Sequence, residues 1–372
     1  MHVTDRSTAR TFDAMGTLLL ADRDPHSHHP FAKQWFDREL DDVFALNEMG
    51  LCDFLDQAKA QRVLRRTLEV LNENLSRSTA DHIAERVGFG LSQERKRAET
   101  AIAFLRAIVE QFEQRGHPIL VMKTLDHWPD TGSDLDLLVT APEQTVCRIF
   151  ESEFSAQRQS QSWGDRLANK LNFRIPGLWE LVEVHVGCLG QTGEQKALAN
   201  RLLTRRVYET FGGHSFPVPI PEDRIVIATL QRMYRHFYIR LTDIVNIVGL
   251  LTHDRVDFDH LKAIAEVGAI WPGVATLLVI ARQHGLRYGS RSVELPEMVK
   301  SAAQFNARHT YLGRSFVRVP IVPEGVNLFL RQFVGNGRKH DFHALMRLSL
   351  LPILATAAFV SFRLTGDDKG VW

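Results

Sequence analysis

Apolar side chains recur every three to four positions over most of the first third of the chain, from about residue 31 to residue 115. Phe36 and Leu40 are examples, and Gly116 directly follows the last stripe. Residues three and four apart share one face of an α-helix, and a glycine after such a stripe commonly ends the helix. We therefore expect packed helices over residues 31–115, preceded by a polar, extended lead-in over residues 1–30.

After residue 116 the apolar positions form short continuous runs. Residues 117–124 (HPILVMKT) and 135–139 (LDLLV) read as strands, and residues 143–154 read as a helix. Two further extended runs, KLNFRIPG and LWELVEVHVG, follow one another across a Pro-Gly turn. This arrangement predicts a β-hairpin. Residues 117–190 are thus expected to form a compact α+β unit.

Helical spacing returns between residues 222 and 286, after a proline-rich connector at residues 216–221. A less regular region with glycine and proline extends to about residue 336. The fold class that we expect is α+β, with a small mixed β-sheet between two helical regions. The expected domains are an N-terminal helical region, the α+β core and a mainly helical C-terminal domain, at residues 1–94, 95–215 and 216–372.

Residues 348–362 are almost entirely apolar and lie between Arg347 and Arg363. This run is shorter than the roughly 20 residues that a membrane-spanning helix needs, and Pro352 interrupts it. We interpret the run as a buried terminal helix of the core. The alternative is a contact with a membrane surface or with a partner protein.

The composition is that of a globular protein, with 44% apolar and 24% charged residues among 372. Lys+Arg 45 against Asp+Glu 44 gives no global reason to expect a nucleic-acid partner. Cys52, Cys147 and Cys188 show no CxxC spacing, which argues against a disulfide framework or a cysteine zinc site. The N-terminus lacks the layout of a signal peptide, so we expect a cytoplasmic protein.

Two polar clusters have simple interpretations. His26, His28 and His29 lie close together, but no further ligand set stands nearby in sequence, so a solvated loop is favoured over a metal site. The basic residues between positions 331 and 347 can contact an anionic acceptor such as RNA. A solvated charged face is the preferred reading of this stretch.

The main chemical signal is the pair Asp134 and Asp136 in the run GSDLDLLV. Successive side chains of a strand face opposite sides, so the two carboxylates share one face, about 6–7 Å apart along the strand. Two acids next to an apolar run are costly unless a cation lies between them. Magnesium is the natural candidate, because it takes hard oxygen ligands and often holds substrate phosphates as well.

The predicted hairpin supplies a third acid. In LWELVEVHVG, Glu183 and His185 share one strand face, with valines on the other. Glu183 can complete a metal site or accept the proton of an attacking hydroxyl. His185 can orient Glu183 or contact substrate, and a hydrogen-bonded core histidine is equally compatible with its position.

The order of these motifs resembles the polymerase-β-type nucleotidyltransferases, and most closely their bacterial branch of loosely characterised members. Sequences of that branch read LLKG, a variable loop, DIDLLV and then IDLHW. Here the matching stretches read VMKT, SDLDLLV and VEVHV, at residues 121–124, 133–139 and 182–186. RHFYIRLTDIVNIVGLL and DRVDFDHLKAIAEVGA resemble the helical region of the same branch. The resemblance covers about residues 95–290.

This resemblance implies a nucleotidyltransferase core and transfer of a nucleoside monophosphate from a nucleoside triphosphate, with two Mg²⁺ ions or with Mn²⁺. Asp134 and Asp136 would bind metal, and Glu183 would ligate the metal beside the acceptor and help to deprotonate it. A small molecule, a peptide or a protein is favoured as the acceptor over an RNA end. The residues expected to contact the nucleotide are Lys123, Thr124, Ser133, His185 and Arg240.

Two departures from the family pattern bear on activity. The glycine that follows the family's lysine is Thr124 here, and a β-branched residue fits poorly where backbone approaches phosphate closely. Gly132 and Ser133 abut the acids and do not replace that glycine. The usual third aspartate is Glu183, which is one methylene longer. These departures keep open a catalytically degenerate module of the same fold.

Other residues have both a functional and a structural interpretation. Asp126, His127 and Trp128 precede the acids, and a base can stack on Trp128 unless its ring packs on the domain surface. A single helical segment is expected to carry four further polar residues, which either face a triphosphate or, at Arg240 and Asp243, form an i,i+3 ion pair. These four residues are Arg235, His236, Arg240 and Asp243.

A second enzyme class also uses an Asp-x-Asp motif with a divalent ion, namely the nucleotide-sugar glycosyltransferases. Those enzymes place the motif after a βαβ nucleotide-binding half. Here about 95 helical residues precede the first expected strand, which argues against that class.

Overall fold

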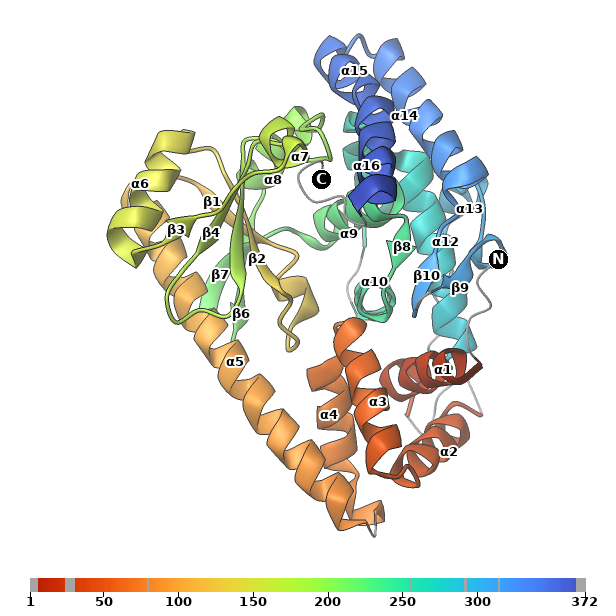
Figure 1. The fold of residues 1–372 in the computed structure, drawn as a ribbon. Helices are drawn as coiled ribbons and strands as arrows, with labels where there is room; N and C mark the ends of the chain where they lie inside the picture. The colour runs from red at the N-terminus through yellow and green to blue at the C-terminus, as the bar shows by residue number, and fades with distance from the viewer. Residues whose placement is uncertain are drawn as a thin grey trace.

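The computed structural model describes residues 6–23, 31–78, 80–253, 256–290, 293–313 and 315–365. Helices form one end of the molecule, and one long helix leads from them to the β-sheet (Figure 1). The helices predicted over residues 31–115 are confirmed. The elements are α1 (Arg6–Leu20), α2 (Ala32–Phe44), α3 (Glu48–Ala60), α4 (Leu64–Glu73), the short η1 (Leu75–Arg77) and α5 (Asp81–Gln114).

Helix α1 corrects the prediction of an extended lead-in. Phe12, Met15 and Leu18 repeat at three-residue steps and are buried against the neighbouring helices. These three apolar residues form a short pattern among polar residues, which is easily missed in the sequence. They are nevertheless enough to pack one face of α1 against its neighbours. The histidines at positions 26, 28 and 29 lie outside the described residues.

The predicted small mixed sheet is confirmed, and its strand order is β1-β2-β5-β4-β3. Strands β2 and β5 are parallel, and the other neighbours are antiparallel, including the predicted hairpin of β4 and β5. The 3-10 helix η2 (Leu125–His127) lies between β1 and β2. The remaining elements of this unit are β1 (Ile119–Met122), β2 (Asp134–Val139), α6 (Glu143–Phe154), β3 (Gln157–Arg158), α7 (Trp163–Leu167), β4 (Lys170–Arg174) and β5 (Leu181–Val186).

The two faces of the sheet have different partners. Leu135, Leu137 and Val184 pack with α5 and α6 in one apolar core. Leu138 on the opposite face belongs to the core of the helical regions. The alternation of β2 therefore points Asp134 and Asp136 toward the C-terminal helices, away from α5. The predicted boundary at residues 94 and 95 falls inside the continuous helix α5, and the division into three domains stays a prediction.

The predicted connector at residues 216–221 is wrong in part, because residues up to Val218 belong to a strand. β6 (Val207–Phe211) and β7 (His214–Val218) form a separate antiparallel hairpin, which α8 (Lys196–Thr204) precedes. Tyr208 pairs with Pro217 in this hairpin. A proline is tolerated there because a two-stranded hairpin has strand edges without a further partner. β7 packs against β1 and α5 and so extends the core around the sheet.

The C-terminal half is mainly helical, as predicted, with a second small sheet of order β8-β10-β9. The predicted continuous helical region is interrupted between residues 237 and 240 and contains a π-helix. Its elements are α9 (Pro221–Thr229), π-helix η3 (Leu230–His236), β8 (Tyr238–Ile239), α10 (Leu241–His253), α11 (Phe258–Val267), α12 (Trp271–Arg287), α13 (Glu297–Ala302), η4 (Ala307–His309), β9 (Tyr311–Gly313), β10 (Phe316–Arg318), η5 (Ile321–Gly325), α14 (Val326–Arg338), α15 (Phe342–Ser349) and α16 (Leu351–Thr365).

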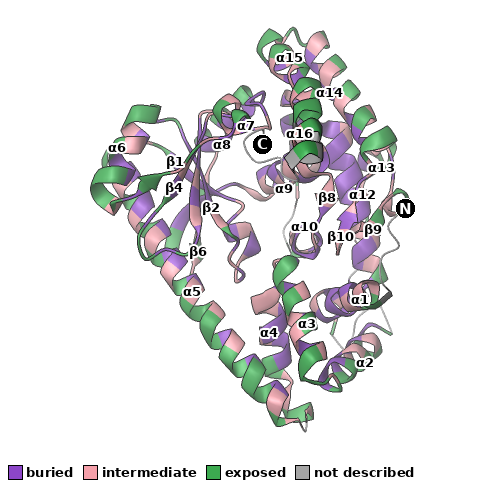
Figure 2. Cartoon of the chain, viewed as in Figure 1, coloured by how far each residue is buried: buried purple, intermediate pink, exposed green. Residues whose placement is uncertain are grey.

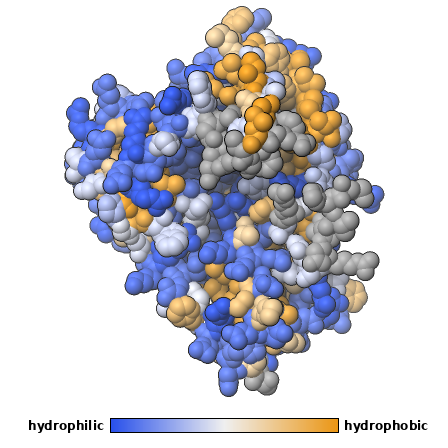
Figure 3. All heavy atoms as spheres, viewed as in Figure 1, coloured by the Kyte–Doolittle hydropathy of each residue, from blue (hydrophilic) through white to orange (hydrophobic). Residues whose placement is uncertain are grey.

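The interpretation of residues 348–362 as a buried terminal helix is wrong. Ile353 is 65% exposed and Leu364 is 80% exposed, and α16 is largely coloured as exposed in Figure 2. Hydrophobic side chains gather on the surface formed by α14, α15 and α16 (Figure 3). An apolar segment is buried only where another element packs against it. The composition of the segment does not show whether such an element is present. The alternative, a contact with a membrane surface or a partner, stays a prediction.

None of the described helices combines the length and the apolar character needed to cross a membrane. The three cysteines are free in the structure.

Acid is expected to destabilise the fold through His284 on α12. Burial, followed by the neighbouring Arg287, lowers the pKa of His284 to about 4. Because the imidazole has an ordinary pKa near 6.5 in the unfolded chain, its contribution is fully present above pH 6.5 and is lost as the pH falls through 4. The full loss is about 3 kcal/mol. Urea unfolding between pH 7 and pH 4 measures it.

His284→Leu should flatten that pH dependence because the group that must be protonated is gone. The matched control is His309→Leu, since His309 is exposed. Equal pH slopes for the wild type and His284→Leu would contradict the prediction.

Candidate active site

Strands β2 and β5 bring two predicted carboxylates together. Their parallel register places Asp136 beside Glu183. Ligand atoms of Asp136, Glu183 and His185 all lie within 4.8 Å of one another. His185 Nε2 donates a hydrogen bond of 2.9 Å to Glu183 Oε1 and lies 3.9 Å from Asp136 Oδ1. Two carboxylates and an imidazole on one sheet face form a donor set that suits a divalent cation.

Asp134 lies on the same face, two residues before Asp136. Its carboxylate contacts Ser133 and Arg62 instead of the cluster. Ser133 Oγ donates to Asp134 Oδ2 at 3.0 Å, and an Arg62 nitrogen lies 3.7 Å from the same oxygen. Burial raises the pKa of Asp134, and the neighbouring Asp136 and Glu183 carboxylates raise it further. The negative charges of Asp136 and Glu183 therefore act on Asp134, although Asp134 does not belong to the cluster of Asp136, Glu183 and His185.

Lys123 occupies a position that the sequence did not predict. Its Nζ lies 2.5 Å from Asp136 Oδ1 and 3.8 Å from Glu183 Oε1. The ammonium pairs with the two carboxylates, and the predicted contact of Lys123 with the nucleotide stays a prediction. Lys123 has a φ of +52°, a left-handed conformation that costs a non-glycine residue about 1–2 kcal/mol. The ion pair with Asp136 helps to hold this conformation.

A second ammonium, that of Lys170, reaches the cluster from β4. Lys170 is buried, and its Nζ lies 2.6 Å from Glu183 Oε2 and 3.6 Å from Asp165 Oδ1. Burial alone would raise the pKa of Glu183, but Lys170, then the hydrogen bond from His185 and the charge of Lys123, hold it well below its ordinary range. Glu183 is therefore ionised and can act as a ligand or as a proton acceptor.

The backbone conformation of Thr124 does not require a glycine. Its backbone is right-handed helical, with φ −53° and ψ −49°, so the left-handed residue of this turn is the preceding Lys123. The Thr124 hydroxyl accepts the backbone N–H of Asp136 at 2.8 Å. The β-branched residue therefore ties the loop to β2. Its fit beside a phosphate stays a prediction.

Thr124→Val is expected to lower the free energy of unfolding by about 1–3 kcal/mol, because it leaves the buried N–H of Asp136 without an acceptor. Thr124→Ser keeps the hydroxyl and serves as the control. Urea unfolding of the three proteins measures the difference. A valine variant as stable as the serine variant would show that the hydroxyl bond contributes nothing.

The prediction that Arg235, His236, Arg240 and Asp243 share one helical segment is wrong. The π-helix η3 ends at His236, Phe237 takes a left-handed conformation, and α10 begins at Leu241. The predicted ion pair of Arg240 and Asp243 is replaced by that of Arg232 with Asp243, at 2.8 Å. Arg240 instead donates its backbone N–H to Asp243.

The Arg240 guanidinium donates to Tyr238 Oη at 3.2 Å and lies over the rings of Tyr238 and Phe316. Burial, followed by the nearby Arg62 and Arg232, lowers the pKa of Arg240 to about 10. Arg240 thus stands in a cationic region that continues to Arg62 at the edge of the carboxylates. Its contact with a nucleotide stays a prediction.

The loop residues before the acids are used in packing. Asp126 pairs with Arg224 at 3.3 Å, and Asn246 donates to the buried His127 Nδ1 at 2.8 Å. The Trp128 ring packs under the Arg65 guanidinium and against Phe211. Of the two interpretations of Trp128, the structure agrees with a packed ring and not with an open stacking platform.

Sequence reasoning missed Arg62 and Lys170. Lys170 pairs with His185 in the register of β4 and β5, so strand alternation in the predicted hairpin contained a signal for it. Arg62 arrives from a turn after α3, far from the acids in sequence, and no local pattern indicates its position. Both cations matter because they balance the charge of the predicted ligands.

A mixed sheet with acids on adjacent parallel strands, capped by helices, defines a nucleotidyltransferase-type core. Residues 48–284 match a family described as uncharacterised nucleotidyltransferases, so the chain belongs to this family. No curated protein matches the chain. The matched region begins well before residue 95, so α3, α4 and Arg62 are part of the family unit. Membership in this family supports a general nucleotidyltransferase role and a nucleotide as substrate.

Proposed function

We propose that this chain transfers a nucleoside monophosphate from a nucleoside triphosphate to a hydroxyl acceptor, with Mg²⁺ as the metal and Mn²⁺ as the alternative. The observation that carries the proposal is the placement of Asp136 beside Glu183 and His185 on neighbouring parallel strands. Family membership supports the reaction class. A small molecule, a peptide or a protein is favoured as the acceptor, because the chain has a net charge of only +1.

The residues present fit a divalent cation. Asp136 and Glu183 offer hard oxygen donors, as Mg²⁺ prefers, and an imidazole ligand such as His185 also suits Mn²⁺. His185 Nδ1 is buried without a hydrogen-bond partner among the described residues, while Nε2 faces the acids. Asp134 stands beside this set and would supply a further carboxylate. A metal held here would supply Lewis-acid chemistry at a phosphoryl oxygen and at the acceptor hydroxyl.

The residues of the chain have distinct roles in the proposed reaction. The acceptor oxygen forms a bond to the α-phosphorus, the bond from that phosphorus to its bridging oxygen breaks, and pyrophosphate leaves. Glu183, which is ionised, accepts the proton of the acceptor hydroxyl. The ion pair with Lys170 fixes the Glu183 carboxylate. Lys123, which reaches both Asp136 and Glu183, offers a positive charge to developing phosphate charge.

The second candidate is a catalytically degenerate nucleotide-binding or interaction module. One observation favours it: Lys123 and Lys170 already compensate the charge of Asp136 and Glu183. An ammonium paired with a predicted ligand competes with a metal ion for the same oxygen atoms. Such a module would bind a nucleotide and release no pyrophosphate.

The test is incubation with each α-labelled nucleoside triphosphate and Mg²⁺, with acceptors of the three classes: small hydroxyl compounds, peptides and RNA 3′ ends. The wild type is compared with Asp134→Ala/Asp136→Ala. Label transfer and pyrophosphate release by the wild type, lost in the double variant, support the enzyme. Equal release by both proteins overturns the site, and nucleotide binding without release favours the degenerate module.

A further inference from the structure

A cavity of about 590 Å³ opens beside the carboxylates, between the N-terminal helices and the edge of the sheet. We call it the Trp179 groove. Its chemically distinctive lining consists of Lys59, Arg62, Asp134, Arg174 and Trp179. Its volume lies within the range of about 300–1,000 Å³ that is typical of sites for small ligands. It is therefore large enough to be a substrate site, and Asp134 connects it to the proposed metal ligands.

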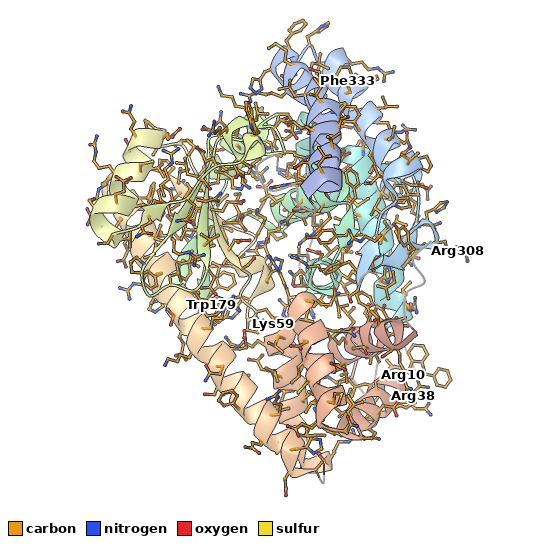
Figure 4. The ribbon with its side chains drawn as sticks, viewed as in Figure 1. Arg10, Arg38, Lys59, Trp179, Arg308 and Phe333 are labelled. Atoms are coloured by element: carbon orange, nitrogen blue, oxygen red, sulfur yellow. The ribbon has the colours of Figure 1, made fainter. Side chains whose placement is uncertain are left out.

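Trp179 is held outward by its neighbours in the chain. Leu178 and Glu180 are buried, and Arg97 Nε lies 2.6 Å from Glu180 Oε1, which anchors the turn between β4 and β5. Trp179 is 75% exposed. Figure 4 shows Trp179 and Lys59 near one another, on facing edges of the sheet and of the N-terminal helices.

The groove carries positive charge that has no internal partner. Among the described residues, neither Lys59 nor Arg174 has an acidic group within 4.0 Å of its charged nitrogens. The acids Glu94 and Asp130 of the lining already face arginines, at 3.9 and 3.3 Å. Asp134, the remaining acid of the lining, faces Arg62 at 3.7 Å, so the charges without an acidic partner are those of Lys59 and Arg174. A flat indole beside unpaired cations is suited to a ligand that combines a planar ring with anionic groups.

The side on which the groove opens indicates which substrate it takes. In the proposed reaction Glu183 receives the acceptor's proton, and Glu183 does not line the groove, whereas Asp134 does. In-line displacement places the leaving group opposite the attacking hydroxyl, which is the side away from Glu183. The groove on the Asp134 side therefore corresponds to the donor nucleotide and not to the acceptor.

We propose that the Trp179 groove binds the donor nucleoside triphosphate, with the base stacked on Trp179 and the phosphates near Lys59, Arg62 and Arg174. The inference rests on the proposed function and names a donor class for it, the purine nucleoside triphosphates. A purine presents a larger face to the indole than a pyrimidine does, and stacking strength sets such preferences in sites without base-edge hydrogen bonds. Trp179 is then a specificity-determining residue, and adenine and guanine nucleotides bind about equally.

The experiment measures equilibrium binding of ATP, GTP, CTP and UTP with Mg²⁺ to the full chain, by calorimetry. Trp179→Ala is expected to weaken ATP and GTP binding by about 5- to 150-fold and to reduce the purine preference. The matched control is Trp163→Ala, because Trp163 is 66% exposed and does not line the groove. Lys59→Ala and Arg174→Ala should weaken all four nucleotides alike and lower the salt dependence, with the exposed Lys96→Ala as control.

Outcomes for this inference and for the proposed function are separable. If the wild type binds nucleotide and Trp179→Ala binds it equally well, the groove is not the base site, and the transferase proposal is unaffected. A Trp179-dependent purine preference without pyrophosphate release supports the groove and overturns the transferase. Absence of nucleotide binding by the wild type overturns the groove assignment, as does an unchanged nucleotide Kd with a raised KM for the acceptor.

Discussion

Replacement of Asp136 by asparagine is expected to reduce nucleotidyl transfer by at least about 10³-fold, the order seen when a charged or polar group that stabilises a transition state is removed. Asp136 Oδ1 lies 2.5 Å from Lys123 Nζ and 3.9 Å from His185 Nε2, and Asp136 pairs with Glu183 in the strand register. An amide oxygen is a weaker ligand than a carboxylate, and the amide NH₂ would face Lys123. Label transfer and binding of Mn²⁺, followed by electron paramagnetic resonance, measure the effect.

The control for loss of one acidic charge is Glu143→Gln on α6, whose carboxylate pairs with the exposed Arg158 at 2.7 Å. It should leave transfer and Mn²⁺ binding unchanged. Asp134→Asn should affect Mn²⁺ binding less than Asp136→Asn, since Asp134 is outside the tight cluster. Undiminished Mn²⁺ binding by Asp136→Asn would refute the assignment of the cluster as a metal site.

The largest effect on stability is expected for Asp243→Ala. Asp243 and Arg232 are both buried, and Arg232 Nε lies 2.8 Å from Asp243 Oδ2. Asp243 also accepts the backbone N–H of Arg240 at 2.7 Å, so it fixes the start of α10. Removing it leaves a buried guanidinium without a counter-charge, at a cost of about 3–5 kcal/mol. Urea unfolding at pH 7 is the measurement.

The chain offers a control ion pair of similar length at the surface. Arg106 and Glu110 are separated by 2.7 Å on α5, with side chains about half exposed. Glu110→Ala should cost no more than about 1 kcal/mol, because exposed pairs contribute little. The double variant Arg232→Met/Asp243→Leu should recover part of the loss, since neither charge remains buried. A cost for Asp243→Ala that equals the cost for Glu110→Ala would contradict the argument.

Several elements near the site were predictable because their signals are local. Strand alternation places Asp134 and Asp136 on one face, and the same rule places Glu183 with His185. The hairpin of β4 and β5, the helix α5 ended by Gly116 and the α+β class follow from periodicity and turn residues. These features depend on residues within a few positions of one another, which is the range over which a sequence pattern carries information.

The cationic partners and the cover of apolar surfaces depended on longer-range contacts. The ion pair of Lys123 with Asp136 joins residues 13 positions apart, next to a left-handed turn at residue 123. Arg62 reaches Ser133 from a segment 71 positions away. The π-helix before Phe237 interrupts a pattern that otherwise reads as one helix. In each case the local sequence pattern supported a different prediction, and a tertiary contact determined the observed structure.

By itself, the sequence determined that carboxylates meet on a sheet face between helical regions, because alternation and amphipathic spacing are properties of the local backbone. Only the tertiary structure decided that Lys123 and Lys170 neutralise those carboxylates, that α16 is left exposed, and that Trp179 faces Lys59 across a groove. The physical reason is that the partner of a charge and the cover of an apolar face are set by elements that arrive from distant parts of the chain.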